Sequence, residues 1–110
     1  MMCSSFEVIV SIPPVTLERA VDLLACMAHP VRLAVLARLH RDGPTHVSVL
    51  KEELGVEQSA LSHHLRHLRQ ARLVVGDRDG KRVVYRLHDS HVGCIVEDTL
   101  QHAAELGEEG

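Results

Sequence analysis

The chain has 110 residues, of which 45% are hydrophobic and 25% are charged, a balance that indicates one globular domain and excludes wholesale disorder. Its formal net charge is −3 and only 2% of its residues are aromatic, so the predicted core is aliphatic and suited to packed helices. The sequence has no apolar run near the roughly 20 residues that a membrane helix needs, and it has no signal-peptide pattern. We therefore expect a cytoplasmic protein without a membrane partner.

The N-terminal third is predicted to hold an arm and two helices. Residues 1–15 end in two prolines and lack a helical period, which indicates an extended arm. Thr16 is a favourable N-cap for a first helix, and Pro30 is suited to the first turn of a second helix that ends near Asp42. The apolar residues that recur at helical spacing in the first helix are Leu17, Ala20, Val21, Leu24 and Met27.

A helix-turn-helix and a hairpin are predicted to follow. Thr45 is expected to cap a short third helix that Gly55 ends, and a fourth helix is expected over 58–73. A helix, a short turn containing glycine and a second helix form the helix-turn-helix pattern. The period then changes to two, and Asp79 and Gly80 are predicted to turn a two-stranded hairpin. With a last helix in 88–106, this order predicts a mainly α winged helix-turn-helix with about five helices.

The charges are distributed unevenly along the chain. The stretch 58–86 holds seven of the twelve basic residues and only two acidic ones, whereas 88–110 holds six acidic residues and no Lys or Arg. This asymmetry predicts that a basic segment faces a polyanion, although a solvated charged surface is the usual alternative.

The outward face of the fourth helix is predicted to contact DNA. Placing its leucines inward leaves an almost acid-free face of hydrogen-bonding side chains that can reach base edges or phosphates. The hairpin adds a basic wing beside it. An amphipathic helix with a solvated face is the alternative, but the conjunction of helix-turn-helix, outward face and basic wing favours DNA. The predicted contacts are Ser59, Ser62, His63, Arg66 and Gln70 on the helix and Arg78, Lys81 and Arg82 on the wing. His64 and His67 lie nearer the apolar side and are predicted to make packing contacts.

The last helix carries a candidate metal site that needs two chains. His91 and His102 share a face but lie roughly 16 Å apart along the axis, too far to hold one ion together. If two copies of the helix cross antiparallel, Asp89 and His91 of one chain meet His102 and Glu105 of the other, beside an apolar seam. Two imidazoles and two carboxylates suit zinc, nickel or cobalt. The alternative is that Asp89 is simply an N-cap and Glu105 an exposed tail residue.

Three parts of the sequence resemble the ArsR/SmtB family of metal-sensing bacterial repressors. They are AHPVRLAVLARL, EQSALSHHLRHLRQARLVVGDRDGKRVVYRL and the terminal pattern D-x-H, ten residues, H-x-x-E. The resemblance implies a homodimeric winged helix whose affinity for a palindromic operator is weakened by a metal ion. It also implies base or phosphate contacts from Gln58, Ser59, Ser62 and His63, and an inter-subunit metal site at Asp89, His91, His102 and Glu105.

Two further features concern the signal that is sensed. The third helix lacks the family's cysteine cluster, which disfavours sensing of arsenic, cadmium or lead. The wing and fourth helix resemble the nickel and cobalt sensors, whereas the H-x-x-E ending resembles the zinc sensors. Nickel usually takes six donors, and here it would need waters or the N-terminal arm with Cys3. The ion stays undecided between nickel or cobalt and zinc.

The sequence therefore predicts a metal-responsive regulator, a repressor by resemblance, that binds double-stranded operator DNA as a homodimer. The domain is expected over 16–106, with a tail at 107–110. No phosphate loop, nucleophile elbow or zinc-protease motif is present, so neither an enzyme nor a small organic substrate is expected. The alternative is a metal-independent, redox-responsive or activating winged-helix regulator. Three scattered cysteines fit no disulfide framework, and Cys26 and Cys94 are predicted to be buried.

Overall fold

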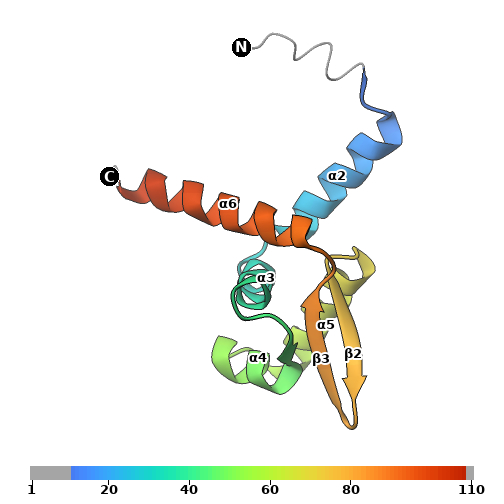
Figure 1. Cartoon of the computed structure of the whole chain (residues 1–110), viewed down its shortest axis with the longest axis vertical. Coiled ribbons are helices and arrows are strands. Elements are labelled where there is room, and N and C mark those ends of the chain that lie inside the picture. The colour runs from blue at the N-terminus through green and yellow to red at the C-terminus, as the bar shows by residue number, and fades with distance from the viewer. Residues whose placement is uncertain (1–10, 109–110) are drawn as a thin grey trace.

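The computed structural model describes residues 11–108, and most of the predicted N-terminal arm, with Cys3, lies outside them. Five helices and a small antiparallel sheet follow in the predicted order within these described residues, which confirms the winged helix-turn-helix fold (Figure 1). The elements are α2 (Pro14–Met27), α3 (Pro30–Asp42), β1 (Thr45–His46), α4 (Val47–Leu54), α5 (Gln58–Gln70), β2 (Val74–Asp79), β3 (Arg82–Leu87) and α6 (Ser90–Glu108).

The first described helix begins earlier than the sequence predicts. Pro13 occupies the N-cap position and Pro14 starts α2, so Thr16 is not the cap and the predicted arm overlaps the helix. Proline fits there because the first-turn N–H groups have no partner within a helix. Among the described residues, no single helix is long and apolar enough to cross a membrane, and only α2 and α3 pass that test together, as a pair bent by 94°.

Thr45 does not cap α4, which corrects the prediction from sequence. It lies in β1 opposite Tyr85, and its Oγ1 donates a hydrogen bond to the carbonyl oxygen of Gly43 at 2.8 Å. The sheet therefore has three strands in the order β1-β3-β2 rather than two. Gly55 ends α4 with φ 63°, as predicted, because glycine accepts a left-handed backbone without a steric penalty.

Two boundaries around the wing also differ. Helix α5 ends at Gln70, before the predicted limit, because Arg72 adopts φ 61° and turns the chain toward β2. Asp79 pairs with Arg82, so the two-residue loop is formed by Gly80 and Lys81, one position later than predicted. Gly80 takes φ 67° at the first loop position, which suits the turn that joins two twisted strands.

The core lies where α3, α4, α5 and the sheet meet, and the start of α6 covers it. The predicted apolar seam of α6 divides into two sets: Val92 and Val96 are buried in this core, whereas Ile95 and Leu106 are 44% and 60% exposed. The other residues of the core are Met27, Val35, Leu36, Leu39, Leu50, Leu61, Leu65, Leu68, Leu73, Val74 and Tyr85.

Of the apolar residues at helical spacing on α2, only Met27 is buried within the described residues. Leu17, Val21 and Leu24 are 44–58% exposed, and α2 projects away from the core (Figure 1). Cys94 is exposed rather than buried, and Cys26 is half-buried with its Sγ 3.7 Å from the carbonyl oxygen of His67. Helices α2 and α6 thus present large apolar side chains to the surroundings.

Candidate DNA interface and metal ligands

The position of α5 follows from its three leucines. Leu61, Leu65 and Leu68 are at most 2% exposed and fix the helix on the core. The opposite face then points outward, as the helical projection predicts. Six side chains named as DNA contacts are exposed there: Gln58, Ser59, Ser62, His63, Arg66 and Gln70.

The N-cap of α5 is an acidic residue, Glu57, which precedes the outward face predicted to contact DNA. The hydroxyl of Ser59 donates a hydrogen bond to Oε1 of Glu57, the residue at the N-cap position. This bond lowers the pKa of Glu57 below its ordinary value. A carboxylate therefore stands at the edge of the predicted DNA face and holds Ser59 in a defined orientation.

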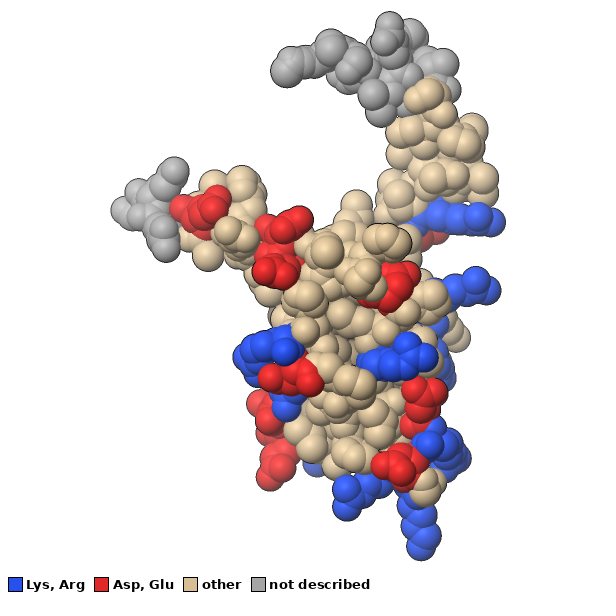
Figure 2. All heavy atoms as spheres, in the orientation of Figure 1, with Lys and Arg blue, Asp and Glu red and all other residues tan. Residues whose placement is uncertain are grey.

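The wing carries exposed basic side chains that make no ion pair within residues 11–108. Arg69 donates to the Tyr85 hydroxyl at 3.1 Å and Arg86 pairs with Asp77 at 3.2 Å, so these two guanidinium groups hold the wing together. The predicted wing contacts Arg78, Lys81 and Arg82 are exposed, and within residues 11–108 none of them forms an ion pair. In the view of Figure 2, the Lys and Arg side chains lie mainly over the lower half of the molecule. The charged side chains visible on the projecting α6 are all acidic.

His64 and His67 make the neighbour contacts predicted for them. Nε of Arg32 donates to Nδ1 of His64 at 3.0 Å, and the ring of His29 lies 4.4 Å from that of His64. Burial lowers the pKa of His64, and the neighbouring His29 and Arg32 lower it further. Nε2 of His67 is 3.2 Å from Nε2 of His63.

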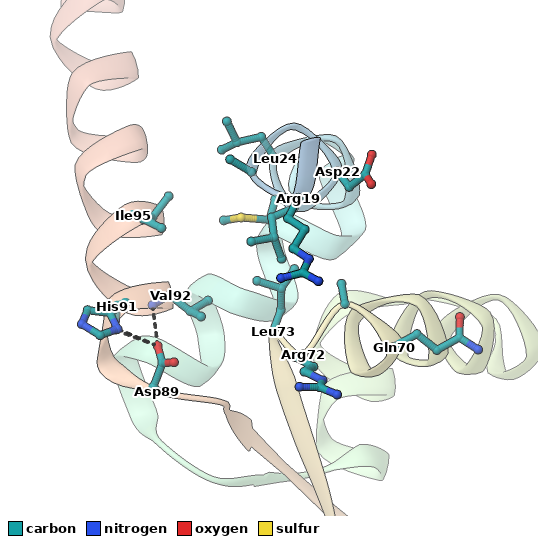
Figure 3. A pocket seen from close by; sticks show the side chains of 14 residues that line it. Arg19, Asp22, Leu24, Gln70, Arg72, Leu73, Asp89, His91, Val92 and Ile95 are labelled. Atoms are coloured by element: carbon teal, nitrogen blue, oxygen red, sulfur yellow. Dashed lines mark hydrogen bonds and ion pairs between the residues drawn. The ribbon is translucent and has the colours of Figure 1, made fainter. Parts of the chain in front are cut away.

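Asp89 caps α6, as the alternative interpretation of the sequence holds. Its Oδ1 accepts hydrogen bonds from the backbone N–H groups of His91 and Val92 at 3.0 and 3.3 Å. Its Oδ2 lies 3.2 Å from Nδ1 of His88, and this contact is the main cause of a lowered Asp89 pKa. Nδ1 of His91 is 3.5 Å from Oδ1 (Figure 3). An ionised carboxylate and an imidazole therefore lie side by side at the start of α6.

The other predicted ligands form a second pair at the far end of the same helix. Nδ1 of His102 is 3.9 Å from Oε1 of Glu105, and these side chains are 73% and 63% exposed. Within residues 11–108, no group of three His, Cys, Asp or Glu side chains is arranged to hold a metal ion. Within one chain the four predicted ligands therefore form two separate pairs, one at each end of a 19-residue helix.

An open pocket of about 800 Å³ lies between α2, the end of α5 and the start of α6. Leu24 on α2 and Ile95 on α6 project into the gap between their helices, and the ring of His91 turns away from it (Figure 3). The apolar faces of α2 and α6 therefore flank the first ligand pair.

Comparisons with known proteins show which family of proteins the chain is similar to. Residues 27–77 match a family model described as a helix-turn-helix domain. The chain is 47% identical over 83 residues to the HTH-type transcriptional regulator NmtR of Mycobacterium tuberculosis, which covers 76% of this chain and 68% of that protein. It is 41% identical over 93 residues to the HTH-type transcriptional repressor SmtB of the same species, covering 84% and 68%.

A solved structure shares the fold as well. HlyU from Vibrio cholerae superposes with a TM-score of 0.74 at 35% identity, covering 84% of this chain and 97% of that one. The helix-turn-helix, the wing and these sequence identities lead to one assignment. The chain belongs to the ArsR/SmtB family and is a DNA-binding transcriptional regulator rather than an enzyme.

Proposed function

We propose that this regulator is a metal-responsive repressor that binds palindromic double-stranded operator DNA as a homodimer. A divalent transition metal ion at the paired α6 helices changes its affinity for that DNA. One observation carries the proposal: two exposed ligand pairs lie at opposite ends of α6, beside apolar side chains that are largely exposed in the described part of the chain. The name of the relative SmtB, a transcriptional repressor, supports the direction of control.

The exposed apolar side chains support self-association. Val21 and Leu24 on α2 and Ile95 and Leu106 on α6 are 44–60% exposed. Burying such area releases about 25 cal/mol per Å². Because a twofold interface pairs identical surfaces, an α6 that packs antiparallel on its copy covers this area in both chains at once.

The same antiparallel arrangement completes the metal site. Asp89 and His91 of one chain would meet the partner's His102 and the partner's Glu105, and twofold symmetry would repeat the site. Oδ1 of Asp89 accepts the two helix amides, so Oδ2 would bind the ion in place of its present contact with Nδ1 of His88. The donor set of two imidazoles and two carboxylates fits zinc, nickel or cobalt. The ion supplies a bridge between the two chains when it is bound.

The position of the two α5 helices supports a change in operator affinity when the ion binds. Two α5 helices must match major grooves about 34 Å apart to bind one palindrome. Helix α6 packs on α3, and α3 packs on α5, so the relative orientation of two α6 helices sets that of the α5 helices. A coupling free energy of about 1–3 kcal/mol gives a usable change in operator affinity.

The test measures operator affinity by fluorescence anisotropy, with and without Zn²⁺, Ni²⁺ or Co²⁺. His91→Ala and His102→Ala are each expected to remove the metal response and to leave metal-free operator binding unchanged. Gln101→Ala, which alters an exposed neighbour on the same helix, is expected to keep the response. Equal affinity of the unmodified protein with and without these ions would contradict the proposal and favour a metal-independent regulator.

A further inference from the structure

Four histidines lie in contact outside the predicted ligands of α6. His29 precedes α3, whereas His63, His64 and His67 belong to α5. The ring centroids of His29 and His64 are 4.4 Å apart, and those of His63 and His67 are 4.5 Å apart. Other contacts account for His29 and His64, because Nδ1 of His29 accepts a hydrogen bond from the backbone N–H of Val31 and Nδ1 of His64 accepts one from Arg32. The second pair is available for another role.

The second pair already has the spacing of two ligands to one ion. His63 and His67 are one helical turn apart, their Nε2 atoms are separated by 3.2 Å, and their rings are inclined at 75°. Two imidazole nitrogens at about 2.0–2.1 Å from a metal ion lie about 3.3 Å apart in a tetrahedral complex. Adjacent ligands of an octahedral complex lie about 2.9 Å apart, from the same bond length. The observed separation falls between these values, so little side-chain movement is needed.

We propose that His63 and His67 form a second site, on α5, for a divalent transition metal ion such as Zn²⁺. Within residues 11–108, no third His, Cys, Asp or Glu joins them, so water fills the remaining coordination positions. Imidazole pairs select ions of intermediate softness over Mg²⁺ or Ca²⁺. The site does not depend on the ligands of α6 or on the proposed repressor function.

The cationic surroundings of this pair oppose the binding of a dication. Arg32 donates to His64, the residue next to His63, and Arg66 precedes His67 on α5, so both guanidinium groups repel a divalent ion. We therefore expect this site to fill after a site that contains the carboxylates of α6. Because His63 is exposed on the outward face of α5, an ion bound here lies on the surface predicted to contact DNA.

The first experiment isolates the pair in the full chain without an affinity tag. The double variant His91→Ala/His102→Ala removes both imidazoles of α6, and calorimetric titration with Zn²⁺ is expected to find one remaining ion per chain. Adding His63→Ala or His67→Ala is expected to abolish that binding. Adding His88→Ala, which removes an exposed imidazole elsewhere, is the matched control and is expected to retain it. Circular dichroism verifies that each variant is folded.

The second experiment reads the coordinating atoms. Zn²⁺ is expected to shift the Nε2 resonances of His63 and His67 in long-range ¹H–¹⁵N spectra of the imidazole rings, and Mg²⁺ is expected to shift neither. Failure of the double variant to bind Zn²⁺, or binding that survives His67→Ala, would overturn the proposal. The repressor proposal is judged separately, by the metal response of operator binding in the chain with α6 intact.

Discussion

His40 on α3 lies against Gly93 on α6, and a β-carbon at position 93 would collide with Nδ1 of the imidazole. The other ring nitrogen, Nε2, is 2.8 Å from Oε1 of Glu97, one turn further along α6. The ring therefore fills the contact between the two helices. Gly93 is needed for this close approach, because any larger residue displaces the ring from Glu97.

We expect Gly93→Ala to lower the free energy of unfolding, measured by urea titration at fixed protein concentration. Overpacking typically costs about 1–3 kcal/mol. Alanine in a helix gains only about 0.5–1 kcal/mol over glycine, so the loss is expected to prevail. In a His40→Ala background the obstructing ring is absent, and Gly93→Ala is expected to stabilise the fold by about 0.5–1 kcal/mol. Equal effects in both backgrounds would show that the ring is not the cause.

The exposed apolar residues of α6 are expected to control self-association. Ile95→Glu places a charge in the proposed interface, so it is expected to raise the dissociation constant of the dimer while the single chain stays folded. Sedimentation equilibrium measures the constant, and a cooperative urea unfolding transition verifies the fold. Ser48→Glu, on the exposed surface of α4, is the control and is expected to have no effect. An unchanged constant for Ile95→Glu would place the interface elsewhere.

The face of α5 and the wing are expected to differ in how they bind DNA. Arg82→Ala removes a phosphate contact, so it is expected to weaken operator and unrelated DNA alike and to reduce the slope of log affinity against log salt by about 1. Arg66→Ala is expected to cost about 1–3 kcal/mol on the operator and less on unrelated DNA. Arg41→Ala, beside Asp42 at the end of α3, serves as the control. Identical losses for Arg66→Ala on both DNAs would contradict a base contact.

His64 is expected to make stability fall in mild acid. Burial, with help from His29 and Arg32, lowers its pKa from the ordinary value of 6.5. The unfolded chain therefore binds a proton at a higher pH than the folded chain, and the free energy of unfolding decreases as the pH falls below about 6.5. His64→Gln, whose amide oxygen can accept the Arg32 hydrogen bond, is expected to flatten this decline in urea titrations. An unchanged slope would exclude His64 as its source.

Strong periodicity explains what the sequence predicted correctly. The three leucines of α5 recur at helical spacing and are buried, so the outward side chains follow from geometry alone. The two-residue strand at Thr45 has too few residues for any period, and its partner Tyr85 lies forty positions away. Local propensity therefore predicts that Thr45 caps a helix, whereas Thr45 lies in strand β1 of the sheet.

Other features of the structure depend on contacts that the sequence pattern alone does not define. The apolar residues of α2 recur at helical spacing, but within residues 11–108 Val21 and Leu24 are more than half exposed. The contact of His63 with His67 could have been found from sequence, because the two residues are one helical turn apart. The hydrogen bond between Ser59 and Glu57 depends on the backbone at the N-cap, which periodicity does not encode.

From Glu97 to Gly107 every residue of α6 is exposed, and this part of the helix extends beyond the rest of the molecule (Figure 1). Helices of such length are only marginally stable alone in water. In the proposed dimer, the contacts that hold the two subunits together also keep this overhang helical. Dilution of that dimer is therefore expected to reduce the far-ultraviolet ellipticity along with the mass, and the proposed bridging ion is expected to restore both.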